Sequence, residues 1–371
     1  MSQEPVKKTL PFFNVSSTSK VQLQIVPLNQ LLQDRITDES KVPELEPIVR
    51  IDESVFAVKG DISVVGGLPK AGKTAISVFM LGTALKQLSI NVDTLSIRSA
   101  NCYEKPVIYI DTEQSRTFTN KLRKSVLKLI DENKSPKNFF VFNLRKYPRA
   151  SDKLKIIMSL FQHFQDAHLW IIDGLADLVN NPNDVTESFQ IVADFMSIAD
   201  TMQTCIIFYL HENPGTLQKL RGNLGSEIER KCFGAINIRK DREKNFHWIE
   251  PRMLRGSIDF MKIYFRYDVD QQRMRSLDES EKAEAEKSVD KTAIKLTKLK
   301  ELAEKATNKG KDCPLNYEAL WPRIQEHHIT VFGRIIRERS AQTKIKNMLE
   351  NGILEKDNNN LYNLSKVNDG E

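Results

Sequence analysis

The chain has 371 residues, of which 40% are hydrophobic and 28% are charged, and its net charge is +6. A chain of this length can bury one large core and still supply a small second domain. No apolar run approaches the length of a membrane span, and the four scattered cysteines, without a C-x-x-C pair, argue against a disulfide framework or a zinc site. We therefore expect a cytoplasmic protein without a membrane segment; the modest positive charge permits nucleic-acid binding but does not require it.

Residues 1–55 are expected to form an N-terminal arm, with a strand-like run at 21–26 followed by a stretch rich in Pro and Glu. From residue 56 to 270, short apolar runs alternate with helical patterns, which predicts an α/β domain with a mostly parallel sheet covered by helices. The expected strands are 62–65, 107–110, 139–142, 169–172, 206–210, 235–238 and 261–267.

A complete phosphate-binding motif, G-x-x-x-x-G-K-[ST], follows the first of these strands and precedes a helical pattern over 75–88. In such a loop the backbone N–H groups face the phosphates, the lysine reaches the β and γ oxygens, and the hydroxyl binds Mg²⁺. The expected nucleotide-binding residues are Gly67, Leu68, Pro69, Lys70, Ala71, Gly72, Lys73 and Thr74.

A second metal-binding group is expected at Asp173, which ends the apolar run Leu169–Ile172. Ligands of open α/β sheets bind at the carboxyl ends of the strands, so this carboxylate would face the Mg²⁺ held by Thr74. The alternative is that Asp173 caps the next helix.

The run 107–110 is followed by Asp111-Thr112-Glu113, and an Asp-x-Glu one strand after the phosphate loop resembles the RecA/DnaB class of P-loop ATPases. The resemblance implies a RecA-like core that binds ATP and Mg²⁺, with Glu113 as the base that activates water. Alternatively, Glu113 forms a surface ion pair with Arg116 or Lys121.

The same resemblance assigns His211, which follows the run 206–210, to contact with the γ-phosphate; a purely structural histidine is the alternative. The segment Leu220–Ser226 resembles the basic, glycine-containing segment that contacts DNA in DnaB-like helicases, which marks Arg221. It could equally be an ordinary surface loop.

Arg252 and Arg255 lie near the end of the expected ATPase domain, where hexameric members of the class carry arginines that reach a neighbouring subunit's nucleotide. Such a residue acts only across a head-to-tail interface. Either arginine could instead form a structural ion pair.

The resemblance spans about residues 48–268 and is nearest to the RepA-like branch of hexameric helicases, which shares the Gly-x-Pro-Lys-x-Gly-Lys-Thr loop. It implies a homo-oligomer, most simply a hexameric ring, that acts on single-stranded DNA in replication or mobilisation of a mobile element. The chain departs from that pattern where Gly174 and Leu175 follow Asp173, and its channel loops are not distinctive.

Residues 271–290 are highly charged and are expected to form a linker or a solvated helix. In 291–371, helices are expected near 294–306 and at 317–328, 330–339 and 340–351, with Gly352 closing the last and a hairpin over 353–364. This order is the outline of a winged-helix domain. Its expected DNA-contacting residues are Arg334, Arg337, Lys344 and Lys346; docking of replication or mobilisation proteins is the alternative.

The leading hypothesis is an ATP-driven DNA motor of the helicase type. A RecA-like or KaiC-like protein that uses ATP to switch assembly or recruitment, without unwinding DNA, is the alternative. A small-molecule kinase shares only the phosphate loop, since no acceptor pocket or lid is marked in the sequence.

Overall fold

The computed structural model describes residues 27–40, 42, 44–213 and 219–365. Within them the protein has mixed α/β architecture with a large, mostly parallel central sheet, which confirms the expected α/β class. The strand-like run expected at 21–26 lies outside the described residues.

The central sheet holds nine strands in the described part of the chain, in the spatial order β12-β11-β10-β9-β3-β8-β7-β5-β6. The six strands from β9 to β6 are parallel, and β10, β11 and β12 extend the sheet antiparallel beyond β9. The strands are β3 (Ile62–Gly67), β5 (Val107–Asp111), β6 (Phe139–Asn143), β7 (Leu169–Asp173), β8 (Cys205–His211), β9 (Gly234–Asp241), β10 (Phe246–Leu254), β11 (Ile263–Asp268) and β12 (Arg273–Ser276).

Helices cover both faces of this sheet, because successive side chains of each buried strand point to opposite faces. Val65 and Ile171 pack toward α2 (Lys73–Leu85) and α3 (Arg116–Leu129). Val64 and Trp170 pack toward the opposite layer. That layer contains α4 (Ala150–His163), η2 (Leu175–Leu178), α5 (Val185–Met202) and α6 (Gly222–Lys231).

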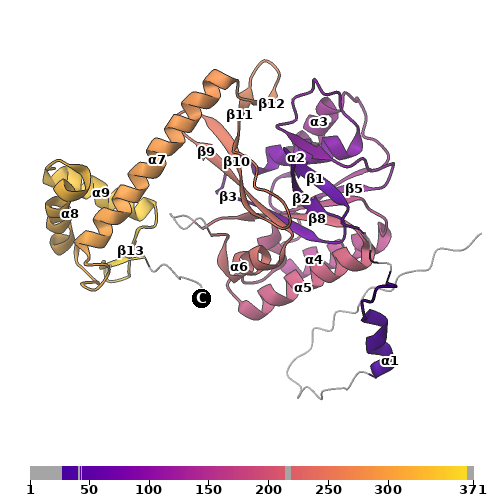
Figure 1. The fold of residues 1–371 in the computed structure, drawn as a ribbon, viewed down its shortest axis with the longest axis horizontal. Coiled ribbons are helices and arrows are strands. Elements are labelled where there is room, and N and C mark those ends of the chain that lie inside the picture. The colour runs from indigo at the N-terminus through magenta and orange to yellow at the C-terminus, as the bar shows by residue number, and fades with distance from the viewer. Residues whose placement is uncertain (1–26, 41, 43, 214–218, 366–371) are drawn as a thin grey trace, which may run out of the picture.

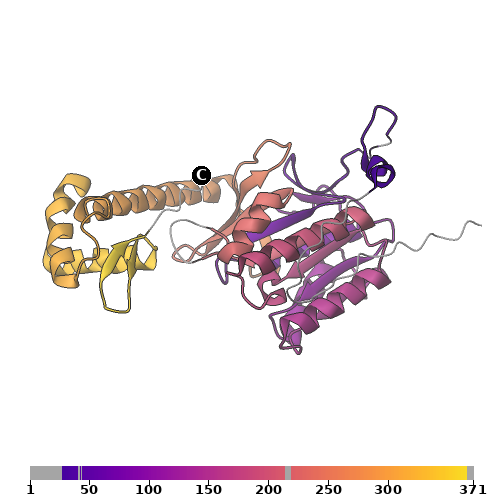
Figure 2. The same cartoon turned by 90° about the horizontal axis from the view of Figure 1, so that it is seen from below.

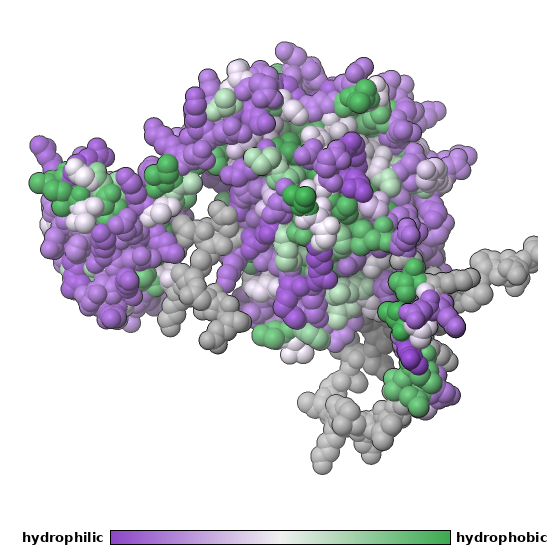
Figure 3. Space-filling view, in the orientation of Figure 1, coloured by the Kyte–Doolittle hydropathy of each residue, from purple (hydrophilic) through white to green (hydrophobic). Residues whose placement is uncertain are grey.

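A small antiparallel sheet, β2-β1-β4, shares the core of the α2 face and consists of β1 (Pro47–Ile51), β2 (Ser54–Val58) and β4 (Ile97–Ser99). The boundary expected between residues 55 and 56 therefore falls inside β2. Before it, α1 (Leu28–Leu31) and η1 (Leu32–Asp34) stand apart from the α/β body (Figures 1 and 2). Their leucines are exposed, and Figure 3 shows hydrophobic residues over this segment.

The charged segment 271–290, expected to be a linker or a solvated helix, is helical over residues 279–290. It contains β12 and the start of α7 (Glu279–Ala306), a 28-residue helix that begins with a capping box between Asp278 and Glu281. Its first turns pack through Ala285 against Phe246 and Tyr264 of the sheet. Because the helix continues without a break past residue 290, it carries the C-terminal module away from the α/β body (Figure 1).

The C-terminal module has its own core, formed by the end of α7, α8 (Tyr317–Phe332), α9 (Glu338–Glu350) and the hairpin β13 (Leu354–Lys356) and β14 (Tyr362–Leu364). The hairpin is confirmed, and Leu315 forms a further antiparallel bridge with Tyr362. The helix expected over 330–339 is wrong. Gly333, with φ 71°, ends α8, because a left-handed residue closes a helix, and residues 334–337 are non-helical.

None of the described helices combines the length and the apolar character needed to cross a membrane.

Candidate functional site

One edge of the sheet, where the neighbouring strands β3, β8, β7 and β5 end, brings together five of the expected site residues: Lys73, Thr74, Glu113, Asp173 and His211. Gly67 is in register with His211, and Asp111 with Asp173. Carboxyl ends of parallel strands lie on the same side of a sheet, so residues more than 140 positions apart in the chain are brought together there.

The phosphate-loop motif forms a compact turn between β3 and α2. Gly72 precedes α2 with φ 102°, a left-handed conformation that L side chains rarely adopt. The Ala71 amide donates to the Leu68 carbonyl at 3.1 Å, which closes the turn. The first N–H groups of an α-helix have no acceptors within the helix, and in this position they suit an anion.

Lys73 holds the centre of the site. Its Nζ donates to the Gly67 carbonyl at 2.8 Å and lies 2.9 Å from His211 Nδ1. Burial lowers the pKa of Lys73, and the carboxylates of Asp173 and Glu113 oppose this shift. An ammonium group only donates, so His211 accepts at Nδ1 and carries its proton at Nε2.

His211 Nε2 faces Glu113 Oε2 at 3.4 Å, which links Lys73, His211 and Glu113 in one chain of polar contacts. The hydrogen bond from His211 lowers the pKa of Glu113, so this carboxylate is held ionised. Glu113 thus contacts His211; the surface ion pair with Arg116 or Lys121 that the sequence left open does not form in the described part of the chain.

Asp111 fixes the turn that presents Glu113. Its Oδ1 accepts from the Glu113 and Gln114 amides at 3.1 and 2.8 Å, and its Oδ2 accepts from Thr119 Oγ1 at 2.7 Å. Gln114 Nε2 in turn donates to Thr74 Oγ1 at 3.2 Å. The two acids of the Asp-x-Glu motif therefore have different surroundings: Asp111 is buried and bonded within the turn, while Glu113 faces the site.

Thr74 and Asp173 lie side by side, as expected for a shared metal ion. Thr74 Oγ1 is 3.3 Å from Asp173 Oδ2, which also accepts from Tyr109 Oη at 2.8 Å. Burial raises the pKa of Asp173 to about 6, against the opposing effects of Tyr109 and Lys73. A hydroxyl beside a buried carboxylate is an oxygen donor set that suits Mg²⁺, which keeps several waters and takes few protein ligands.

The two expected arginine fingers contact groups of their own chain. Arg252 Nη2 donates to Glu229 Oε2 at 3.0 Å, and its Nη1 lies 3.8 Å from the buried Glu212. Glu212 also pairs with Arg239, whose charge opposes the rise in the pKa of Glu212 that burial causes. Arg255 is exposed and donates to the carbonyls of Arg230 and Lys231, which end α6.

The segment Leu220–Ser226, expected to be a basic loop, is mostly helical: α6 starts at Gly222, and Arg221 precedes it as an exposed residue. Its glycines have packing roles, since a Cβ on Gly225 would come within 2.4 Å of the Leu220 backbone. The Arg221 amide donates to the His211 carbonyl at 2.9 Å. Arg221 is therefore tied directly to the strand that carries His211.

His247 of β10 supports the phosphate loop and was missed by the sequence reasoning. Its Nδ1 lies 2.7 Å from the Ala71 carbonyl oxygen, and its buried ring stacks on Phe265 with centroids 5.2 Å apart. A Cβ added to Gly72 would stand 3.0 Å from the same nitrogen. No local pattern marks this histidine, because its partner lies 176 residues away in the chain.

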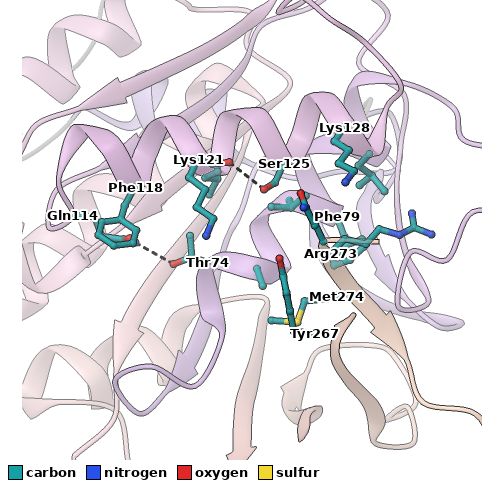
Figure 4. Close-up of a pocket in the computed structure, with 15 residues that line it drawn as sticks. Thr74, Phe79, Gln114, Phe118, Lys121, Ser125, Lys128, Tyr267, Arg273 and Met274 are labelled. Atoms are coloured by element: carbon teal, nitrogen blue, oxygen red, sulfur yellow. Dashed lines mark hydrogen bonds between the residues drawn. The ribbon is translucent and has the colours of Figure 1, made fainter. Parts of the chain in front are cut away.

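A cavity of about 260 Å³ opens beside Thr74, between α2, α3 and the β11–β12 hairpin (Figure 4). Phe79, Phe118 and Tyr267 supply much of its apolar lining, and Lys121 and Arg273 stand at its margins. The cavity is thus continuous with the end of the phosphate loop.

The basic residues expected to contact DNA do not share one surface. Lys346 is exposed and lies 3.8 Å from Glu350, whereas Lys344 is partly buried with its Nζ 4.2 Å from the Phe332 ring centroid. At about 100° per residue, two positions along α9 turn these side chains to different sides. Arg334 and Arg337 are exposed in the loop before α9.

No model of a known protein family matches the chain, and no curated protein sequence matches it.

Proposed function

We propose that this protein is a Mg²⁺-dependent ATPase of the RecA/DnaB class that works as a motor on single-stranded DNA. The observation that carries the proposal is the convergence of Lys73, Thr74, Asp173, Glu113 and His211 on the ends of four neighbouring strands. A phosphate loop alone supports nucleotide binding; the ionised glutamate beside it supports hydrolysis.

Each residue has a role in this proposal. The loop amides and Lys73 bind the β and γ phosphates, and Thr74 with Asp173 holds Mg²⁺, which would neutralise charge that develops on the phosphates. Glu113 orients a water molecule and accepts its proton. When the γ-phosphate draws the Lys73 ammonium away, His211 donates an N–H to the phosphate, and its hydrogen bond to Glu113 changes with it, so that Glu113 senses whether the γ-phosphate is present.

The cavity beside Thr74 would hold the nucleoside, since binding pockets combine apolar and aromatic walls with a few polar groups. Assembly into a ring, most simply a hexamer, would bring Arg252 or Arg255 of one subunit to the nucleotide of the next. A role in replication or mobilisation of a mobile element, in the cytoplasm, completes the proposal.

The C-terminal module is proposed to be a winged-helix domain. Its order of helix, bridging strand, two helices and hairpin supports this, as does the pairing of Leu315 with Tyr362. The long α7 that holds the module away from the α/β body also favours the second candidate, an ATP-switched assembly protein that recruits replication or mobilisation proteins.

Steady-state ATP hydrolysis, measured with and without single-stranded DNA at moderate salt, tests the proposal, with the Lys73→Ala variant as the background control. Strong stimulation by single strands supports the motor and leads to an unwinding assay. Hydrolysis that DNA does not change favours the assembly protein. Wild-type hydrolysis no faster than that of the variant contradicts both.

A further inference from the structure

One side of α7 carries an uninterrupted row of lysines. Lys287, Lys291, Lys295 and Lys298 are all exposed and follow one another at intervals of four, four and three residues, the spacing that places side chains on one helix face. The one acidic residue between them, Asp290, neighbours Lys287 at a spacing of three residues but is turned about 100° away from Lys291. Like charges at this spacing destabilise an isolated helix, so the stability of α7 itself does not explain the row of lysines.

The row leads to further cations on α9 and in the loop before it. Lys298 Nζ and Lys344 Nζ lie 5.8 and 4.2 Å from the centroid of the Phe332 ring, so ammonium groups from α7 and α9 converge on the end of α8. Arg334 lies two residues after Phe332, just beyond the end of α8. Burial lowers the pKa of Lys344, and the positive charges of Lys295 and Arg334 lower it further.

None of these cations forms an ion pair with a carboxylate in the part of the chain that the structure describes. In the described part of the C-terminal module, the ion pairs involve other basic residues, namely Lys305, Arg323 and Lys346. A concentrated positive surface without carboxylate partners suits a polyanion, and phosphate backbones are the anions that proteins bind by such surfaces.

We propose that the face formed by Lys291, Lys295 and Lys298 of α7, Lys344 of α9 and Arg334 binds the phosphate backbone of duplex DNA. The proposal extends the DNA-binding part of the proposed function to a second site, independent of ATP. It also differs from the sequence expectation, since the contact surface includes α7 and excludes the outward side of α9 that bears Lys346.

Duplex is favoured over single strands for two reasons. Proteins bind single strands by stacking bases on accessible aromatic rings, and Phe332 is covered by stacking on His328, with centroids 4.5 Å apart, and by Lys344. The exposed large apolar residues of the module are aliphatic: Ile294, Ile329 and Ile335. Four of the five cations lie on the helices α7 and α9, which hold them in a fixed arrangement, as suits the regular backbone of a duplex.

The test measures binding of the full-length protein to a fluorescent duplex and to a single strand of equal length, without ATP, over a range of salt concentrations. The variant Lys295→Gln/Lys298→Gln/Lys344→Gln is compared with Lys134→Gln/Lys137→Gln/Lys155→Gln, which removes the same charge from exposed positions of the α/β body. A third variant, Arg339→Gln/Lys346→Gln, changes the outward side of α9. Thermal melting shows that each variant is folded.

We expect the first variant to lose about tenfold or more in duplex affinity and to flatten the slope of log K against log salt by about 2 to 3, with the other two near wild type. Equal losses in the first and second variants would mean a net-charge effect and overturn the proposal. So would an effect confined to the single strand, or a larger loss in the third variant. ATP hydrolysis without DNA, measured on the same samples, separates this outcome from failure of the ATPase proposal.

Discussion

The Nδ1 atom of His211 lies 2.9 Å from the Nζ atom of Lys73, and the opposite nitrogen of the same ring faces Glu113. The imidazole of His211 thus contacts both Lys73, the residue proposed to bind the phosphates, and Glu113, the proposed base. A γ-phosphate that draws Lys73 away changes the hydrogen bonding of His211 and, through it, the position of Glu113.

His211→Ala is therefore expected to lower ATP hydrolysis by about two orders of magnitude, the usual scale of an acid–base contribution, with little change in nucleotide affinity. His211→Gln retains a donor and an acceptor and should recover part of the rate. The exposed His163 provides the matched control in His163→Ala. Unchanged hydrolysis in His211→Ala would contradict the role.

Lys73→Ala and Glu113→Gln are expected to separate binding from chemistry. Loss of the ammonium group removes charge-assisted bonds to the phosphates, so nucleotide binding is lost. Loss of the ionised carboxylate leaves ATP bound and unhydrolysed. Fluorescent-nucleotide titration and single-turnover hydrolysis distinguish the two, and an equal loss of binding in both variants would show that the roles are assigned wrongly.

Arg255 is expected to be the residue that acts across the interface, because Arg252 is bound to the carboxylates of Glu229 and Glu212, whereas the exposed Arg255 donates to backbone carbonyls of α6. Arg252→Ala should destabilise the protein by about 1–3 kcal/mol, since it leaves the buried Glu212 and the half-buried Glu229 with less compensation. Arg255→Ala should keep its stability and lose hydrolysis. Mixing Arg255→Ala with Lys73→Ala should restore activity; no recovery on mixing would argue against action in trans.

His247 is expected to act as a positioning residue for the phosphate loop. His247→Leu removes the hydrogen bond to the Ala71 carbonyl and should weaken nucleotide binding by about tenfold, equivalent to about 1.4 kcal/mol. The side-chain amide in His247→Asn can donate to the same carbonyl and should restore most of the affinity. Equal affinity in wild type and both variants would rule out this role.

Stability should depend on pH through the same histidine. Burial lowers the pKa of His247 in the folded state, so below its ordinary value of about 6.5 the unfolded chain binds the proton first. The contribution of the neutral His247 side chain to the free energy of unfolding is complete at neutral pH and is lost as the pH falls. Melting temperatures of wild type and His247→Asn from pH 8 to 5 should diverge less as the solution becomes acidic; a constant difference would contradict the shift.

The sequence by itself determined the fold class and the phosphate loop. Apolar runs such as Leu169–Ile172 and Ile206–Leu210 mark buried parallel strands, because both faces of such strands are covered. The positions of Lys73, Thr74, Asp173, Glu113 and His211 follow from strand ends, since all of these residues lie at the carboxyl edge. These are local patterns, and a single sequence is enough to recognise them.

Only the tertiary structure decided which of these residues touch, and what surrounds them. The contacts of Tyr109 with Asp173 and of His247 with Ala71 join positions 64 and 176 residues apart, a separation that no periodicity encodes. The same holds for the sides of α9 that carry Lys344 and Lys346, and for the continuity of α7. Packing against distant elements decides these contacts and the exposure of each side chain, because the partners of a residue cannot be predicted from its neighbours in the sequence.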